Sequence, residues 1–212
     1  MNDPRRLVRL APLALPLVLL GGCGSLFETH EKPFTVYELK AGTPPAATAR
    51  LAATLVVARP RARPGLDSER IAVTLPGQRL DAYGGARWSA PLPEMVESLL
   101  IEDFRRAGCW QSVVAGRDAF GGRYLVETGI DAFEADYGAG GAAPVVRVRL
   151  SGAIGLAGER RLVATVEGSA EVPAAADRQR EVIAAFERAF DQAAAQLIAA
   201  ADAAAAADAG VR

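Results

Sequence analysis

The fold is decided by a run in which apolar and polar residues alternate, Val146-Arg147-Val148-Arg149-Leu150-Ser151-Gly152-Ala153-Ile154. Successive side chains of a β-strand point to opposite faces of the sheet, so strict alternation predicts a strand with one buried face. Two sets of side chains follow from this pattern. We expect the core face to carry Val146, Val148, Leu150, Gly152 and Ile154, and the solvent face to carry Arg147, Arg149 and Ser151.

The segments on either side repeat this pattern. The preceding one places on a single face Tyr124, Val126, Thr128, Ile130 and Ala132; the following one places there Leu162, Ala164, Val166, Gly168, Ala170 and Val172. Glycine-containing connections at 138–144 and 157–160 suit the turns of β-hairpins. The three strands together predict an antiparallel meander that is buried on one face.

Two segments change to a helical period. Residues 89–107 carry an apolar stripe at three- and four-residue spacing, with Ser89 as the expected N-cap and Gly108 as the stop. A second helix is expected over 176–203, followed by an Ala-rich end that frays from Ala199 to Gly210. Shorter strands are expected at 36–39, 51–57, 70–75 and 78–83. The predicted fold class is α+β, a mostly antiparallel β-sheet packed against two main helices in a single domain.

The N-terminus has the parts of a lipoprotein signal peptide. Three arginines precede an apolar run from Leu10 to Leu20, and Gly21 and Gly22 lead to Cys23. Small residues directly before a cysteine form a lipobox, in which the thiol accepts a diacylglyceryl group and the new N-terminus accepts an acyl chain such as palmitate. A short transmembrane anchor is the alternative, but the apolar run is about half of the roughly 20 residues that a spanning helix needs.

Lipidation of Cys23 implies a division of the chain. We expect a signal peptide at 1–22, a lipidated tether at 23–34, one folded domain at 35–203 and a flexible Ala-rich tail at 204–212. Gly24, rather than an aspartate, follows the cysteine, which favours the outer membrane over the inner one, with the domain facing the periplasm. No cofactor is expected besides the lipid on Cys23.

The residues that carry catalysis in other proteins do not form a set here. His30 is the only histidine and lies in the expected tether, while Cys109 is expected to be a buried small hydrophobe. Neither an acid–base pair, a nucleophile, nor metal-ligand spacing is visible, so we expect no enzyme and no metal. The carboxylates of one predicted strand and its exit are expected to pair across the sheet with Arg147 and Arg149; they are Glu127, Asp131, Glu134 and Asp136.

Charge limits the choice of partners. The formal net charge of the 212 residues is −1, and no basic cluster carries interleaved aromatic residues, which argues against nucleic acid. Arg61, Arg63 and Arg70 form a modest basic group. They are either a solvated loop or a contact for acidic lipid head groups or an acidic partner surface.

The order of residues between Leu55 and Leu99 resembles a known family. Arg70-Ile71, Leu80-Asp81, Tyr83, Arg87-Trp88 and Pro91-Leu92 precede the helix in turn. This order is similar to the ABC-type transport auxiliary lipoprotein family, the lipoprotein partners of mammalian-cell-entry (MCE) type and paraquat-inducible-type lipid transport systems. The resemblance covers residues 34–202.

The resemblance implies a partner complex. It implies an auxiliary, membrane-anchored role beside an MCE-domain protein and an ABC permease and ATPase, with self-association into a ring as a further expectation. Arg87 and Trp88 thereby join the three arginines as candidates for partner or lipid contact. Fold-defining packing of Tyr83 and Trp88, and pairing of Arg87 with Asp67 or Asp81, is the alternative.

Two other classes of function stay open. One is a scaffold or activator lipoprotein of another envelope complex, such as a cell-wall synthase or a secretion pore, which a small tethered domain would suit equally. The other is a hydrolase, which the absence of a visible acid–base or nucleophile set disfavours.

Overall fold

A single nine-stranded sheet carries both helices on one of its faces in the computed structural model of the chain, which describes residues 34–118, 121–138 and 140–210. Cys23, the signal peptide and nearly all of the tether lie outside these residues and remain predictions. The elements, in chain order, are β1 Thr35–Tyr37, β2 Leu51–Val57, β3 Arg61–Ala62, β4 Arg70–Leu75, β5 Arg79–Trp88, α1 Leu92–Ala107, β6 Trp110–Ala115, the 3-10 turn Gly116–Asp118, β7 Tyr124–Asp136, β8 Val145–Leu156, β9 Arg161–Pro173 and α2 Gln179–Gly210.

The expected meander is present. β7, β8 and β9 pair antiparallel along nearly their whole length, and β4 and β5 form a second antiparallel hairpin. Shorter parallel pairings extend the sheet beyond the edge of β7 that β8 leaves free, where β2 pairs with the beginning of β7 and β4 with its end. β1 lies beside β5, and β6 lies beside β2. The α+β class with two main helices is confirmed, and the sheet is mixed, with its longest pairings antiparallel.

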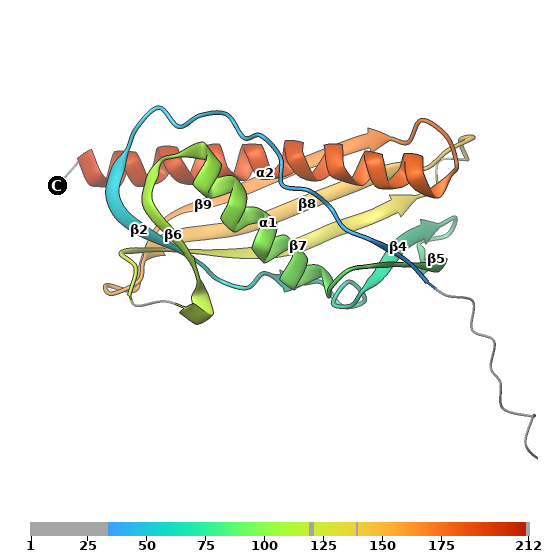
Figure 1. The fold of residues 1–212 in the computed structure, drawn as a ribbon, viewed down its shortest axis with the longest axis horizontal. Helices are drawn as coiled ribbons and strands as arrows, with labels where there is room; N and C mark the ends of the chain where they lie inside the picture. The colour runs from blue at the N-terminus through green and yellow to red at the C-terminus, as the bar shows by residue number, and fades with distance from the viewer. Residues whose placement is uncertain (1–33, 119–120, 139, 211–212) are drawn as a thin grey trace, which may run out of the picture. The chain divides into compact units, whose positions relative to one another are not determined.

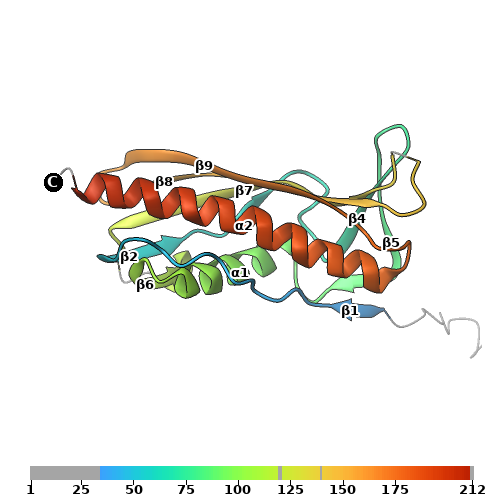
Figure 2. The same cartoon turned by 90° about the horizontal axis from the view of Figure 1, so that it is seen from above.

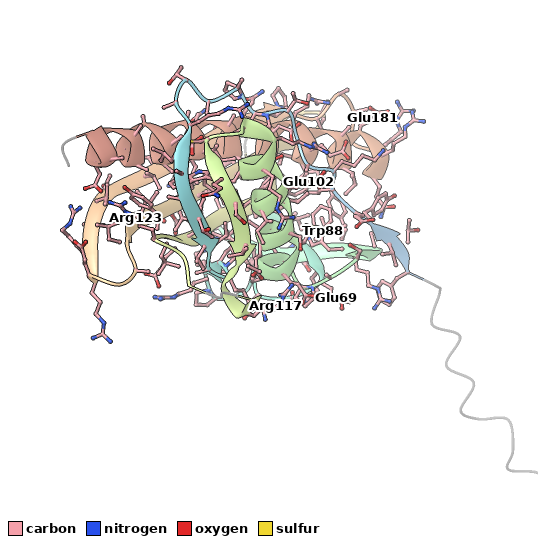
Figure 3. The ribbon with its side chains drawn as sticks, turned by 60° about the vertical axis from the view of Figure 1, so that its left-hand side comes forward. Glu69, Trp88, Glu102, Arg117, Arg123 and Glu181 are labelled. Atoms are coloured by element: carbon pink, nitrogen blue, oxygen red, sulfur yellow. The ribbon has the colours of Figure 1, made fainter. Side chains whose placement is uncertain are left out.

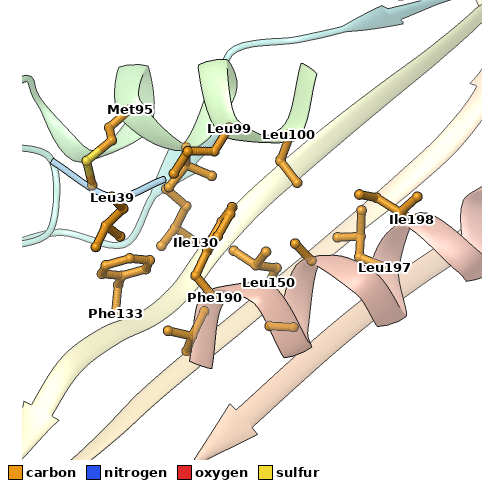
Figure 4. Close-up of a cluster of buried hydrophobic side chains, with 14 of the residues drawn as sticks. Leu39, Met95, Leu99, Leu100, Ile130, Phe133, Leu150, Phe190, Leu197 and Ile198 are labelled. Atoms are coloured by element: carbon orange, nitrogen blue, oxygen red, sulfur yellow. The ribbon is translucent and has the colours of Figure 1, made fainter. Parts of the chain in front are cut away.

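Both helices bury their apolar stripes against the same face of the sheet. α2 lies lengthwise along β8 and β9, and α1 crosses beside it (Figures 1 and 2). Side chains of α1 and α2 converge on Ile130, Phe133 and Leu150 of the strands (Figure 4). Phe133 stacks on Phe186 of α2 with ring centroids 5.3 Å apart. Each large apolar side chain buried in this way contributes about 1.5–3 kcal/mol, so this shared core holds the two layers together.

The sequence predicted the C-terminal end of α1 correctly but not its N-cap. Gly108 ends the helix in the left-handed region at φ 76°, and its N–H donates to the Phe104 carbonyl, as the sequence predicted. The N-cap prediction was wrong: Pro91 occupies that position without a side-chain cap. Ser89 is instead held by β1, because its N–H donates to the Tyr37 carbonyl at 2.8 Å.

α2 is longer than the sequence pattern indicated. It continues to Gly210 through residues 204–210, which had been assigned to a flexible tail, so the expected fraying from Ala199 was wrong. Ala201 and Ala205 are fully buried, and small alanines let the helix lie close to the sheet. Two hydrogen bonds fix this end, from Trp110 Nε1 to Asp202 Oδ1 at 2.8 Å and from the Tyr124 hydroxyl to Asp208 Oδ2 at 2.9 Å.

Two β-bulges change which residues face the core. In β7 the register with β8 slips between Ile130 and Ala132, so that Phe133 points inward and Ala132, expected inside, points outward. In β9 the register slips between Leu162 and Ala164, and Leu162, also expected inside, is 61% exposed. An extra residue inverts the alternation beyond it, which explains both errors.

The described helices include none whose length and apolar content would suffice to cross a bilayer.

Candidate functional surface

The face of the sheet opposite the helices is open, and we call it the outer face. The strand registers order its side chains in rows that run across β7, β8 and β9. These rows are Leu125–Gly155–Leu162, Glu127–Ala153–Thr165, Gly129–Ser151–Glu167, Ala132–Arg149–Ser169 and Glu134–Arg147–Glu171. The middle strand β8 therefore contributes the small residues Gly155, Ala153 and Ser151 to the first three rows and the arginines Arg149 and Arg147 to the last two.

Arg61 and Arg63 lie along the outer face beside β7. Arg61 Nη2 is 3.2 Å from Glu127 Oε1, and Arg63 Nη2 is 2.9 Å from Glu134 Oε2. Arg61 is 83% exposed in its side chain, and exposed pairs of this kind contribute about 0–1 kcal/mol. Both arginines are thus charge-compensated but accessible.

The expected cross-strand pairing of carboxylates with arginines is found for Arg147. It pairs with Asp136 of β7 and with Glu171 of β9, its Nε lying 3.1 Å from Glu171 Oε1. Glu127 and Glu134 pair instead with the arginines of the β3 segment, where the sequence pattern had indicated a loop.

Arg70 and Arg87 lie apart from Arg61 and Arg63, at the end of the sheet that carries β1. They face each other directly across β4 and β5. Arg87 Nη1 is 3.2 Å from Glu69 Oε2, and its guanidinium lies 5.6 Å from the ring centroid of Phe34. The expected partners of Arg87, Asp67 and Asp81, are replaced by Glu69. Arg87 and Phe34 thus give this end of the sheet a mixed cationic and apolar surface.

Trp88 does not belong to any surface. It is 1% exposed and lies on the inner side of the sheet (Figure 3). Its ring meets Phe133 and Phe186 edge-on, with centroids 6.0 Å and 5.3 Å apart. The prediction of a partner or lipid contact at Trp88 was wrong; the alternative of fold-defining packing is what the structure has.

Two grooves run across the outer face. One, of about 680 Å³, is lined by Arg61, Gly129, Ser151, Ala153 and Glu167 among others. The other, of about 400 Å³, lies between Arg63, Arg147 and Arg149. Their linings consist largely of charged and small residues, an arrangement that can hold a polar segment.

A chain of hydrogen bonds between polar side chains links separate elements of the domain. The Tyr137 hydroxyl donates a hydrogen bond to Asp177 Oδ1 at 2.6 Å. Because its proton is used there, it accepts a hydrogen bond from the Tyr83 hydroxyl, also at 2.6 Å. Burial, and then the hydrogen bond to Asp177, raise the pKa of Tyr137 far above its usual value, so it stays protonated. The link ties β5 and β7 to the connection before α2.

Cys109 is a free, buried thiol, as the sequence predicted. Burial, and then the negative charge of Asp202, raise its pKa to about 12. The nucleophilic form of a thiol is the thiolate, so Cys109 is inert at neutral pH. Within the described residues, no group of three His, Cys, Asp or Glu side chains could hold a metal ion.

Buried carboxylates are the feature that sequence reasoning missed. Asp103 of α1 and Asp202 of α2 are 1% and 7% exposed, and burial raises the pKa of each to about 6. A signal was present, because both positions continue an apolar stripe of their helix: Asp103 follows Leu99 and Leu100, and Asp202 follows Ile198.

The open mixed sheet with two helices on one face defines an α+β class of domain. The family comparison is specific: residues 37–198 match the model of the ABC-type transport auxiliary lipoprotein component. The chain belongs to this family.

Solved structures support the same fold. A protein from Xanthomonas campestris, assigned to the family model DUF330, is 25% identical and aligns with a TM-score of 0.77 over 83% of this chain and 99% of its own. An uncharacterized protein is 12% identical, with a TM-score of 0.58 over 85% of this chain and 100% of its own. The PelC dodecamer from Paraburkholderia phytofirmans aligns at 13% identity over 74% of this chain and 93% of its own, with a TM-score of 0.44 that is too low to support inference. No curated protein matches the chain.

Proposed function

We propose that this protein is a periplasm-facing lipoprotein, anchored through Cys23 to the outer membrane, that assists an MCE-type ABC transporter in moving phospholipids or other hydrophobic substrates between the two membranes. The family match over residues 37–198 carries the proposal, because it covers almost the whole described domain. The lipobox at Cys23 supplies the anchor, and two or three acyl chains hold a protein on a bilayer nearly permanently.

The role proposed for the domain is docking. A rigid two-layer body with an open, charged outer face can bind an MCE-domain protein near the membrane. Energy for transport comes from a separate ATPase, since the chain lacks the phosphate-binding G-x-x-x-x-G-K-[ST] loop. Arg61 and Arg63 on the outer face, and Arg70 and Arg87 at the β1 end, are the proposed contact residues.

Crosslinking in the native envelope tests this proposal. The full-length protein is crosslinked in its own membranes and purified, its partners are identified by mass spectrometry and its lipids are extracted. We expect an MCE-domain protein and co-purifying phospholipid. A cell-wall synthase or a secretin without lipid would replace the transport function with the scaffold function.

Three variants and one control variant make the test specific. Cys23→Ala should abolish membrane attachment and lower the yield of the complex. Arg61→Ala and Arg87→Ala should weaken crosslinking, whereas Arg178→Ala, at an arginine of similar exposure beside α2, should not. Equal crosslinking in all three arginine variants would remove the proposed contact residues.

A further inference from the structure

A small apolar notch lies on the outer face where β8 turns into β9. Gly155 forms its floor, with Leu125 of β7 and Leu162 of β9 as its walls in the same row. Gly155 is required there, because an added Cβ would lie 2.7 Å from the Arg161 carbonyl oxygen. We call this site the β8–β9 notch; its volume is about 240 Å³.

The wall at Leu162 exists because of a bulge. Ala164 pairs with Ile154 but Leu162 pairs with Gly155, so Val163 is the extra residue. Without it Leu162 would turn into the core, where the rest of the strand pattern would place it. Bulges that re-aim a side chain are retained features of sheets. The large exposed side chain of Leu162 is therefore a product of the strand geometry itself.

The turn beside the notch contains a residue in a disfavoured backbone conformation. Arg160 adopts φ 49°, a left-handed conformation that is sterically disfavoured for a residue with a Cβ and that glycine adopts freely. Gly158, two residues earlier in the same turn, shows that the segment already contains glycine, yet the left-handed position holds an arginine. Departures from local preference gather at functional sites.

The rim of the notch carries positive charge. Arg160 is exposed and, within the described parts of the chain, has no carboxylate partner, whereas Arg161 pairs with Glu159 and Asp208 and Glu127 pairs with Arg61. Arg123 lies over the Tyr124 ring at 5.7 Å from its centroid. The charge that remains uncompensated beside the apolar walls is cationic.

We propose that the β8–β9 notch binds a segment of a partner protein that presents an apolar side chain next to a carboxylate. The apolar side chain would fill the space between Leu125 and Leu162, and the carboxylate would accept hydrogen bonds from Arg160. A volume of about 240 Å³ suits one side chain and lies below the 300–1,000 Å³ typical of small-molecule sites.

The notch lies far from the β1 end of the domain. The Tyr37 hydroxyl of β1 contacts Gln179 at the start of α2, and Arg161 pairs with Asp208 near its end. At about 1.5 Å per residue of helix, these two points are about 44 Å apart. Figure 3 shows Arg123 and Glu181, which lies in the first turn of α2, at opposite ends of the molecule. The proposal goes beyond the proposed function, since it assigns a binding surface that can be tested without a transporter.

Peptide binding to the full-length protein in phosphatidylcholine nanodiscs tests the notch. The probes are three labelled 12-residue peptides, composed of Leu and Glu, of Leu and Lys, and of Ser and Glu. We expect measurable binding of the Leu–Glu peptide only, weakened at least tenfold by Leu162→Thr and by Arg160→Gly. Arg160→Gly also relieves the left-handed conformation, so it should raise the thermal midpoint while it weakens binding.

Matched controls lie at the other end of the sheet. Leu80 is 41% exposed, and Gln78, like Arg160, is a described non-glycine residue at positive φ, so Leu80→Thr and Gln78→Gly repeat both changes away from the notch. They should leave peptide affinity unchanged. The proposal is overturned if the Leu–Glu peptide does not bind, if all four variants bind it equally, or if the Leu–Lys peptide binds better. Binding of phosphatidylglycerol vesicles that only the notch variants weaken, without peptide binding, would assign the notch to lipid instead.

Discussion

Asp103 shows how one buried carboxylate organises the contact between α1, α2 and the loop before β2. It accepts a hydrogen bond from the Gly42 N–H, and Arg106 of α1 donates to the carbonyls of Ala41 and Gly42. Asp191 of α2 lies against Gly42, where an added Cβ would meet its Oδ1 at 2.6 Å. Burial, and then the negative charge of Asp191, raise the pKa of Asp103 to about 6 against the opposing effect of Arg106.

This raised pKa predicts a stability that increases on mild acidification. The folded state holds the proton of Asp103 up to about pH 6, while the unfolded chain releases it near 3.8. The free energy of unfolding should therefore rise as pH falls from 7 through 6 towards 4, by about 1.4 kcal/mol for each pKa unit of separation at most. Urea unfolding at pH 7.5 and at pH 5 measures the effect.

A substitution isolates the contribution of Asp103. Asp103→Asn keeps the acceptor for Gly42 and removes the charge, so it should stabilise the protein at pH 7.5 and flatten the pH dependence. The exposed Asp131→Asn serves as the control and should change neither. In Asp103→Asn, the pH dependence of the free energy of unfolding that remains is assigned to Asp202 and Asp191, whose pKa values are raised as well. A stability that falls between pH 7.5 and pH 5 in the unsubstituted protein would contradict this assignment.

At the scale of elements, alternation and periodicity were enough to predict the long pieces of the fold. The meander of β7, β8 and β9 and the apolar stripes of the helices follow from side-chain periods that no partner is needed to define. The short strands β3 and β6 were not predicted, because they exist through parallel pairing with β7 and β2 rather than through a pattern of their own. The outward turn of Leu162 likewise depends on a neighbouring strand's register.

The candidate site was less predictable than the fold. The arginines were named correctly as exposed cations, but their division between the outer face and the β1 end follows from topology. Trp88 was wrongly predicted to lie on the surface. The register between β4 and β5 shifts by an odd number of residues between Arg70 and Ala72, and this shift, which only the pairing of the two strands sets, decides the face of the sheet on which Trp88 lies. A sequence pattern gives the period of a strand, but its phase after a bulge comes from the partner.

The helices also protect the edges of the sheet, which sequence alone does not reveal. Gln196 of α2 forms two hydrogen bonds of 3.1 Å with the backbone of Ser169 on β9, as acceptor from its N–H and donor to its carbonyl. Arg105 of α1 donates to the Val113 carbonyl of β6 at 3.1 and 2.8 Å. At Ser169 and Val113 the backbone groups of these edge strands are therefore occupied and cannot pair with another chain.

A close approach between α2 and the sheet predicts an intolerant position. An added Cβ at Gly168 of β9 would lie 1.9 Å from the Ala193 carbonyl oxygen and 3.1 Å from the Leu197 amide, both helix backbone atoms. Gly168→Ala must therefore push α2 away from β9, and we expect a loss of about 1–3 kcal/mol or more in the free energy of unfolding.

The control for Gly168 is another glycine of the same hairpin. A Cβ added at Gly158 would meet no atom within 4 Å, so Gly158→Ala should change stability by less than about 1 kcal/mol. Chemical denaturation of both variants compares them directly. Equal stability of the two variants would show that the helix can shift without cost, contrary to the packing described.

At the scale of the whole molecule, α2 acts as the spine that joins its two ends. Its 32 residues extend about 48 Å at 1.5 Å per residue, from the contact with Tyr37 of β1 to the contacts with Tyr124 and Arg161. The end with the arginines and Phe34 and the end with the β8–β9 notch are thus held at a fixed separation by one rigid element.

The last turns of α2 should therefore contribute to the stability of the whole domain. A chain that stops after Ala203 loses the burial of Ala205 and the hydrogen bond from Tyr124 to Asp208. A buried methyl group is worth about 0.8 kcal/mol and a hydrogen bond about 1 kcal/mol, and the Trp110–Asp202 bond would then lie in a fraying turn. We expect the free energy of unfolding to fall by about 2–3 kcal/mol, measured by urea denaturation.

A chain that stops after Gly210 is the control and should match the full-length protein, while Tyr124→Phe should cost about 1 kcal/mol. If the chain ending at Ala203 were as stable as the full one, these turns would be the dispensable tail that the Ala-rich sequence had indicated, and the far end of the spine would have to be held by β8 and β9 alone.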